Sequence, residues 1–84
     1  MGTVTDQSGG VVAGATVTIV DTDRGVSTTL VTNEPGEYNA PTLNPGKYKV
    51  SAEAKGFKAF ERQNVVLEVG KEVRVDMTLA PGAV

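Results

Sequence analysis

The sequence contains no histidine, no cysteine and no tryptophan. Without histidine or cysteine, the chain offers no imidazole base, no thiolate nucleophile, no disulfide and no Cys/His cluster for structural zinc. Charged residues are nearly balanced, since eight Lys and Arg residues against ten Asp and Glu residues give a formal net charge of −2. Nucleic-acid binding needs a dense basic surface, so no nucleic-acid partner is expected. These absences argue against an enzyme and predict no cofactor and no metal.

Long hydrophobic runs are also missing. The longest are far shorter than the roughly 20 residues that a membrane-spanning helix requires, so no direct membrane insertion is expected. The first residues lack the basic stretch and apolar run of a signal peptide. With 84 residues, the chain makes one domain. We expect this domain over residues 1–80 and a C-terminal tail over residues 81–84, because Pro81 and Gly82 follow the last regularly patterned residues.

Strand-forming residues separated by turns account for the rest of the chain. Fourteen valines and ten threonines favour extended structure, whereas ten glycines and four prolines interrupt it at short intervals. No segment has the three- and four-residue apolar spacing of an amphipathic helix, whereas alternation of apolar and polar residues recurs. Strands are expected over residues 3–6, 15–21, 27–33, 38–40, 48–53, 58–69 and 73–79.

The same alternation predicts which side chains form the core. Segment 58–69 alternates less regularly than the others, and segment 73–79 most regularly. The residues expected to point inward are Ala15, Val17, Ile19, Thr28, Leu30, Thr32, Tyr48, Val50, Ala52, Phe60, Val65, Leu67, Val69, Val73, Val75, Met77 and Leu79.

The turns between the strands carry Gly, Pro, Asn and Asp, which supply the backbone angles that turns need. About seven short strands, each with one apolar face, predict an all-β fold in which two antiparallel sheets pack face to face. We therefore expect a seven-stranded antiparallel Greek-key-type β-sandwich with a wholly apolar interior. Strands of such uneven length favour two sheets over a single closed one. Turns are expected at residues 7–10, 22–25, 33–36, 43–46 and 70–71.

Five stretches, in this order, carry a family resemblance: Gly2–Asp6, Gly14–Ile19, Thr32–Tyr38, Leu43–Val50 and Gly56–Phe57. Together they resemble the carboxypeptidase regulatory-like domain, a transthyretin-like sandwich similar to the B-type repeats of Gram-positive surface adhesins. The resemblance implies a non-catalytic accessory domain of a larger exported bacterial protein, such as a TonB-dependent receptor, a surface protein or a carboxypeptidase. It also implies a periplasmic, extracellular or outer-membrane-associated location, with neighbouring domains of the parent protein as partners.

Two tyrosines and one glycine of these stretches have structural interpretations. Tyr38 and Tyr48 each follow a glycine-bearing turn by two residues, so we expect their rings to cap the core and their hydroxyls to meet water or a turn backbone group. Leu43 is expected to fill the core between them. Gly14 is expected to allow close approach of the two sheets.

Groups with catalytic or metal-binding chemistry are sparse, and we predict no catalytic residue. Ser51 lies near Lys49 in sequence, but both are expected on the wet face of one strand, where lysine is a poor base. Four glutamates alternate with apolar residues and are expected to point outward, namely Glu53, Glu61, Glu68 and Glu72. Asp21 and Asp23 are the one acidic cluster; calcium needs six to eight oxygen ligands, so an Asx-type turn is the better interpretation.

Adhesin-type repeats raise the possibility of an intramolecular isopeptide bond between an early lysine and a late Asn or Asp. The first predicted strand has no lysine. Asp76 lies between the inward residues Val75 and Met77 and should face solvent. We therefore predict no such cross-link.

Two binding modes are left. Strand addition by a protein partner needs an unprotected sheet edge, and the sequence does not fix which strand is an edge. Segment 27–32 is the least charged strand and hence the first candidate, with Thr29 and Val31 as candidate contacts. The alternative is a carbohydrate- or small-ligand-binding module. Its candidate contacts are Phe57 and Phe60, in the irregular segment after Gly56.

Overall fold

A computed structural model describes residues 2–39, 44–68 and 74–82 of the chain. Within these residues there is no helix, and hence none that is long and apolar enough to cross a membrane. Segment 52–63 contains the end of one strand, a turn at Lys55 and Gly56, and the start of the next strand. The strands are β1 (Gly2–Asp6), β2 (Thr16–Asp21), β3 (Val26–Val31), β4 (Glu37–Tyr38), β5 (Gly46–Glu53), β6 (Phe60–Leu67) and β7 (Met77–Leu79).

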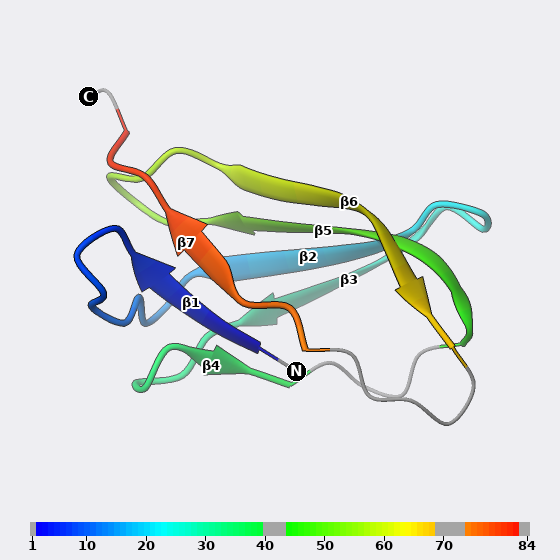
Figure 1. Cartoon of the computed structure of the whole chain (residues 1–84), viewed down its shortest axis with the longest axis horizontal. Helices are drawn as coiled ribbons and strands as arrows, with labels where there is room; N and C mark the ends of the chain where they lie inside the picture. The colour runs from blue at the N-terminus through cyan, green and yellow to red at the C-terminus, as the bar shows by residue number, and fades with distance from the viewer. Residues whose placement is uncertain (1, 40–43, 69–73, 83–84) are drawn as a thin grey trace.

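Two sheets face each other (Figure 1). One has the strand order β4-β1-β7, and the other has the order β3-β2-β5-β6. The predicted all-β, seven-stranded sandwich is thus confirmed for the described residues. One pairing differs from the antiparallel expectation: β7 runs parallel to β1, with Val4 opposite Met77. The reason is that the chain crosses between the sheets after β6 and enters β7 from the end at which β1 begins.

The core lies between the sheets, and most of the predicted inward residues are in it. The last strand is shorter than expected, because pairing begins only at Met77, although Val75 is already buried. Leu43, Val69, Val73 and the turn at 70–71 lie outside the described residues. The buried apolar residues are Val4, Val12, Ala15, Val17, Ile19, Tyr38, Tyr48, Val50, Ala52, Val75, Met77 and Leu79.

The interior is not wholly apolar, which corrects the expectation from the sequence. Asp21 and Thr32 are 6% and 4% exposed. The Thr32 hydroxyl donates a hydrogen bond to Val12 O at 2.8 Å and accepts one from Ala15 N at 2.8 Å. Because the hydroxyl is satisfied in both directions, its burial is tolerated. It fastens the loop before β2 to the end of β3.

The sequence suggested that Gly14 allows close packing of the two sheets, and the structure shows that it does not. A Cβ placed on it would meet no atom within 4 Å, and its φ is +72°. The role of Gly14 is therefore conformational, because glycine adopts this left-handed backbone without steric cost.

The irregular alternation of segment 58–69 has a specific cause in β6. Tyr48 pairs with Val65 but Val50 pairs with Arg62, so β6 carries one extra residue there. Asn64 has a φ of 58°, the left-handed conformation that Asn tolerates best among residues with a side chain. This β-bulge switches the face of the sheet on which alternate residues lie.

Both tyrosines cap the core, as predicted. The Tyr38 hydroxyl donates to Val75 O at 2.6 Å, and the Tyr48 hydroxyl donates to Asn44 O at 2.5 Å. Burial, together with the negative charge of Asp76, raises the pKa of Tyr38 to about 12. The phenol therefore stays protonated and remains a donor across the neutral pH range.

Tyr38 should give the fold a sensitivity to alkali. Since its pKa is about 12 in the folded protein and about 10 in an unfolded chain, the unfolded chain loses the proton first. The stabilisation is complete below about pH 10 and should decrease by about 2–3 kcal/mol as pH rises toward 12. Tyr38→Phe should lose about 1–2 kcal/mol at pH 7, because Val75 O loses its partner, and should lack this alkaline decrease. Urea denaturation of both proteins at several pH values measures the difference; equal alkaline slopes would contradict it.

Candidate functional site

The sheet edge formed by β3 has backbone groups that face away from the protein. On one side of β2, Thr22 donates its N–H to Lys47 O, and on the other Thr32 donates to Ala15 O. The even-numbered residues of β2 thus bond toward β5 and the odd-numbered ones toward β3. By the same alternation, the N–H and C=O groups of β3 that face away from β2 belong to Ser27, Thr29 and Val31. β3 pairs with no other described strand.

The two edges of the four-stranded sheet are built differently. β6, at one edge, carries the bulge and the charged residues Glu61 and Arg62. Arg62 lies opposite the buried Val50, hence on the inner side of the sheet. Bulges and inward charges are the usual devices that prevent another strand from pairing with an edge. β3 has neither device, because its sequence VSTTLV contains no charge and its pairing with β2 is regular.

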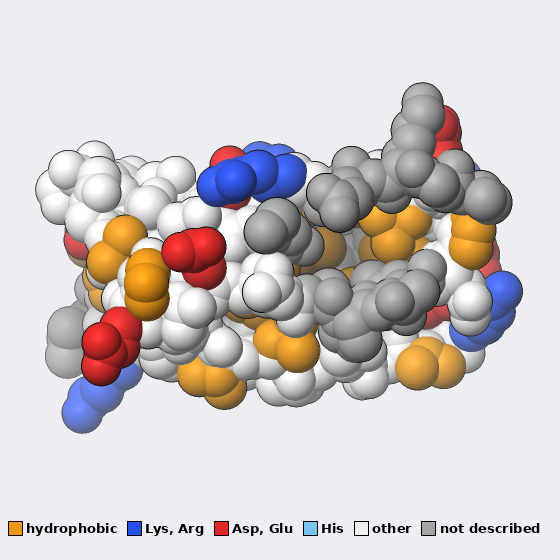
Figure 2. All heavy atoms as spheres, turned by 90° about the horizontal axis from the view of Figure 1, so that it is seen from below, with side chains coloured by type: hydrophobic (Ala, Val, Ile, Leu, Met, Phe, Trp, Pro, Cys, Tyr) orange, Lys and Arg blue, Asp and Glu red, His pale blue; other side chains and the backbone are white. Residues whose placement is uncertain are grey.

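The side chains of β3 are unusually exposed for their type. Val26 and Val31 are 59% and 65% exposed, and Thr29 is exposed as well. Leu30 points inward but is only half-buried against the core. Figure 2 shows the molecule from below, relative to the view of Figure 1. On this side, hydrophobic side chains form several separate patches, and large areas carry no charge. The expected edge position of segment 27–32 is confirmed by the strand order.

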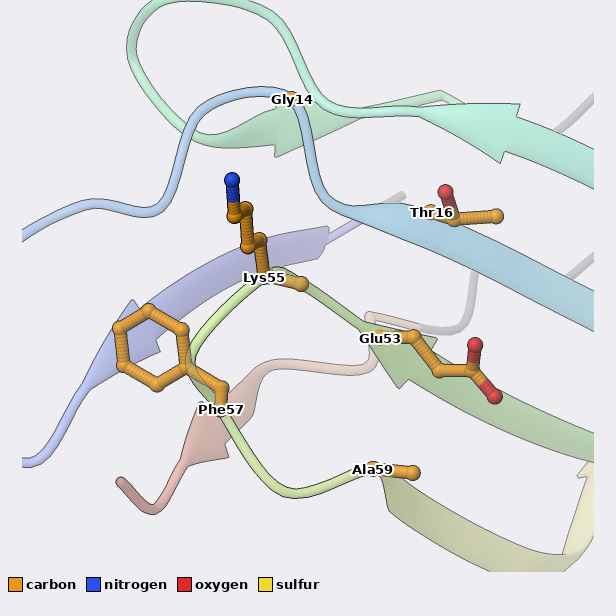
Figure 3. A pocket seen from close by; sticks show the side chains of 7 residues that line it. Gly14, Thr16, Glu53, Lys55, Phe57 and Ala59 are labelled. Atoms are coloured by element: carbon orange, nitrogen blue, oxygen red, sulfur yellow. The ribbon is translucent and has the colours of Figure 1, made fainter. Parts of the chain in front are cut away.

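A pocket of about 400 Å³ lies close to this edge, at the end of β2 and β5. Thr16 joins the two features, because it pairs with Val31 of β3 on one side and with Glu53 of β5 on the other. In Figure 3 the Lys55 side chain extends toward Gly14, whereas the Glu53 carboxylate points elsewhere. The lining residues are Gly14, Thr16, Glu53, Ala54, Lys55, Phe57 and Ala59.

The loop that carries Phe57 is also tied to the last described residues. Lys58 donates to Ala80 O, and Gly82 donates to Gly56 O, both at 2.9 Å. A Cβ on Gly82 would lie 3.0 Å from the Phe57 carbonyl carbon, so the backbones approach closely there. Phe57 itself is half-buried against the core, with part of its ring at the pocket.

Phe60 lies on the edge of the sheet opposite Thr29 and Val31. It is the first residue of β6, and the Arg62 guanidinium carbon stands 5.8 Å from its ring centroid. The four residues singled out from the sequence therefore lie in three places: Thr29 and Val31 on the β3 edge, Phe60 on the opposite β6 edge, and Phe57 in the loop between β5 and β6. Sequence reasoning missed Thr16, Glu53 and Lys55, because only the cross-strand pairing brings them beside Phe57.

The groups considered for catalysis lie on the outer side of the strands. Lys49 Nζ pairs with Glu61 Oε1 at 3.1 Å across β5 and β6. This lysine lowers the pKa of the Glu61 carboxyl, with a smaller contribution from Gln63. Ser51 lies opposite Glu61 in the register, on the same outer face. Both side chains of this ion pair, Lys49 and Glu61, are partly exposed to solvent.

Asp21 forms the Asx turn predicted for the Asp21–Asp23 cluster. Its Oδ1 accepts from the backbone N–H groups of Asp23 and Arg24, and its Oδ2 accepts from the Arg24 guanidinium at 2.9 Å. Burial by itself would raise the pKa of Asp21, but the hydrogen bonds and charge from Arg24 and the Asp23 N–H outweigh it. The pKa of Asp21 is therefore lowered.

Asp21 should make the stability depend on acid. Because its pKa is lower in the folded protein than the ordinary 3.8, its stabilisation is complete above that value and is lost as pH falls through the folded pKa. Asp21→Asn keeps an acceptor oxygen for the turn but removes the charge, so the variant should lose less stability between about pH 5 and pH 2. Thermal unfolding over that range measures this, with Asp23→Asn as the neighbouring control. An Asp21→Asn profile parallel to the wild type would contradict the assignment.

Asp76 faces solvent, as predicted. Its side chain is 57% exposed, and its Oδ1 accepts from Thr3 N at 3.0 Å and from Arg74 Nε at 3.0 Å. It therefore connects the beginning of β1 to the segment before β7 through exposed hydrogen bonds.

Comparison with known proteins agrees with this architecture. The profile of the carboxypeptidase regulatory-like domain family matches residues 1–80. Among curated proteins, the chain is similar to the "TonB-dependent transporter Oar" of Myxococcus xanthus. The two are 34% identical over 84 residues, which cover 99% of this chain and 8% of that protein. The chain thus spans less than a tenth of the length of that relative.

Proposed function

Because the chain belongs to the carboxypeptidase regulatory-like domain family, we propose that it is a non-catalytic accessory domain of a larger exported, outer-membrane-associated bacterial protein. The domain separates neighbouring parts of the parent protein and binds a protein strand along β3. The observation that carries the docking role is the difference between the two edges of one sheet, since β6 is protected and β3 is not.

The accessory role is supported by the comparison with a much longer protein. The relative is a TonB-dependent transporter, of which the similar region is 8%. A domain of this size that lies within such a protein has other parts of the same chain as its first partners. A periplasmic or outer-membrane-associated location of this chain follows from the same likeness and is part of the proposal.

The non-catalytic role is supported by the chemistry of the side chains. The sequence has no histidine or cysteine, and the lysine nearest to a serine in β5 is held by Glu61. The buried carboxylate, Asp21, has all its described hydrogen bonds within its own turn. None of these groups joins a nucleophile to a base in the way that acyl transfer needs.

Ligand binding at the pocket beside Phe57 is the second candidate. Its supporting observation is a half-buried aromatic ring next to Lys55 and Glu53 (Figure 3). Sugar recognition, however, uses exposed rings, and both tyrosines are buried in the core. Titration of the 84-residue chain with a glycan panel, compared with Phe57→Ala, separates the two candidates.

Site-specific photo-crosslinking in the full-length parent protein tests the docking role. A benzoyl-phenylalanine at Val31 should give a protein adduct in cells, whereas the same residue at Val66 on the β6 edge should not. Both valines are more than half exposed, at 65% and 52%, so accessibility is matched. Adding Thr29→Pro should abolish the Val31 adduct, because proline removes an outward N–H. Equal adducts at both positions, or an adduct that survives Thr29→Pro, would contradict the proposal.

A further inference from the structure

We propose that the strand received by β3 is β3 of a second copy of this chain, paired antiparallel about a two-fold axis that passes between the two Thr29 residues. This inference rests on the docking role proposed above and names its partner. The result would be one continuous eight-stranded sheet made of the four-stranded sheets of two molecules.

One antiparallel register pairs all of the outward backbone groups of β3 with those of a second copy. The residues whose N–H and C=O groups face outward are Ser27, Thr29 and Val31, an odd number centred on Thr29. When two such strands run antiparallel, Thr29 lies opposite Thr29 of the second copy, and Ser27 lies opposite Val31 at each end. Each of these three pairs exchanges two hydrogen bonds, so every outward group in the segment gains a partner.

The side chains agree with the same register. On the inner face, Leu30 of one copy would lie opposite Thr28 of the other, and both are half-buried in the single molecule. On the outer face, the exposed Val31 would lie beside Ser27, and the two Thr29 side chains would meet at the axis. β3 has no charged residue, so the two-fold axis brings no like charges together.

The other free edge of this sheet does not offer such a self-pairing. In β6 the extra residue at Asn64 interrupts the alternation of outward groups. A two-fold axis near the middle of β6 would also bring Glu61 and Arg62 of both copies into the interface. The regular, uncharged β3 is therefore suited to pairing with a second copy of itself, whereas the bulge of β6 interrupts such a pairing.

Concentration-dependent NMR of the 84-residue chain tests the self-pairing. Six hydrogen bonds between the two strands favour the dimer, whereas the loss of rotational and translational freedom disfavours it. We therefore expect a weak dimer with a dissociation constant of about 0.1–1 mM. The amide signals of Ser27, Thr29 and Val31 should shift between about 20 μM and 1 mM protein. Thr29→Pro should weaken the dimer at least about tenfold, and Val66→Pro, which removes an outward N–H from β6, should leave it unchanged.

A charge pair at the axis makes the test specific. Thr29→Lys alone and Thr29→Glu alone should each be monomeric, since like charges would meet across the axis, whereas an equimolar mixture should form a heterodimer at least as tight as the wild-type dimer. Both variants change an exposed side chain, so they should fold. A wild-type chain that stays monomeric at about 1 mM, or a mixture that does not associate, would overturn the inference.

The crosslinking experiment distinguishes this failure from failure of the proposed docking role. A Val31 adduct with twice the mass of the parent protein supports the self-pairing. An adduct with a different protein, together with a monomeric 84-residue chain, overturns the self-pairing and leaves the docking role intact. No adduct and no dimer would overturn both.

Discussion

Leu79→Ala should lower the free energy of unfolding by about 3–4 kcal/mol. Leu79 is fully buried in β7, where it pairs with Asp6 of β1 and packs in the core between the sheets. Alanine removes the buried methyl groups and leaves a cavity that the two sheets, fixed by their hydrogen bonds, cannot close. A domain of 84 residues has a total stability of about 4–13 kcal/mol, so the loss is a large share of it.

Chemical denaturation monitored by far-UV circular dichroism measures this effect. Val66→Ala is the matched control, because Val66 lies in a strand but is 52% exposed, and it should change stability by less than about 0.5 kcal/mol. A loss below about 1 kcal/mol for Leu79→Ala would mean that β7 does not pack in the core as described.

Gly36→Ala should be nearly as damaging, with an expected loss of about 2–4 kcal/mol. Gly36 has a φ of +76°, and a Cβ there would stand 2.9 Å from Val4 O and 2.9 Å from the Cβ of Val11. The turn cannot move away easily, because Val4 N donates to Gly36 O at 2.8 Å and Gly36 N donates to Asn33 O at 2.9 Å. The substitution therefore adds backbone strain and a steric clash at the same position.

Gly25→Ala separates these two contributions. Gly25 has a φ of +72°, but a Cβ there would meet no atom within 4 Å. This variant should lose only about 1 kcal/mol, from backbone strain alone. Equal losses for the two variants, measured by the same denaturation experiment, would show that the close approach of the Gly36 turn to β1 is absent.

Local patterns were enough to predict most of the fold. Alternation placed Val17, Ile19, Val50 and Ala52 inside, and the glycine-bearing turns positioned Tyr38 and Tyr48 as caps. Each of these features depends on neighbours in sequence or on one strand pairing. The number of strands, their single apolar faces and their uneven lengths predicted two facing sheets.

The features that the sequence did not reveal depend on long-range contacts or on single backbone angles. The β6 bulge depends on the left-handed conformation of Asn64, which an asparagine residue tolerates but does not require. The parallel partner of β7 depends on how the chain crosses between sheets. The sequence did contain a pattern that indicates burial of Asp21, because this residue continues the inward series of Val17 and Ile19 in β2. The sequence was interpreted only as an Asx-type turn at Asp21, and that turn is what makes the burial of its charge tolerable.

The candidate site divides in the same way. The lack of charge in segment 27–32 was visible and identified β3 as an unprotected edge. The pocket was not visible, because Thr16, Glu53 and Phe57 become neighbours only through the pairing of β2 with β5 and the loop that follows β5. The two phenylalanines given a ligand role from the sequence are placed differently: Phe57 lines the pocket, whereas Phe60 begins β6 with Arg62 beside its ring.

Amide hydrogen exchange on the full-length parent protein is the most direct measurement of the central claim, that β3 is the edge at which this domain meets protein. In the dilute 84-residue chain, the amides of Ser27, Thr29 and Val31 should exchange rapidly because they face solvent. In the assembled parent protein the same three amides should become protected, while Val66 and Glu61 on the β6 edge stay rapid in both. Rapid exchange at all three β3 positions in the assembled protein would contradict the account.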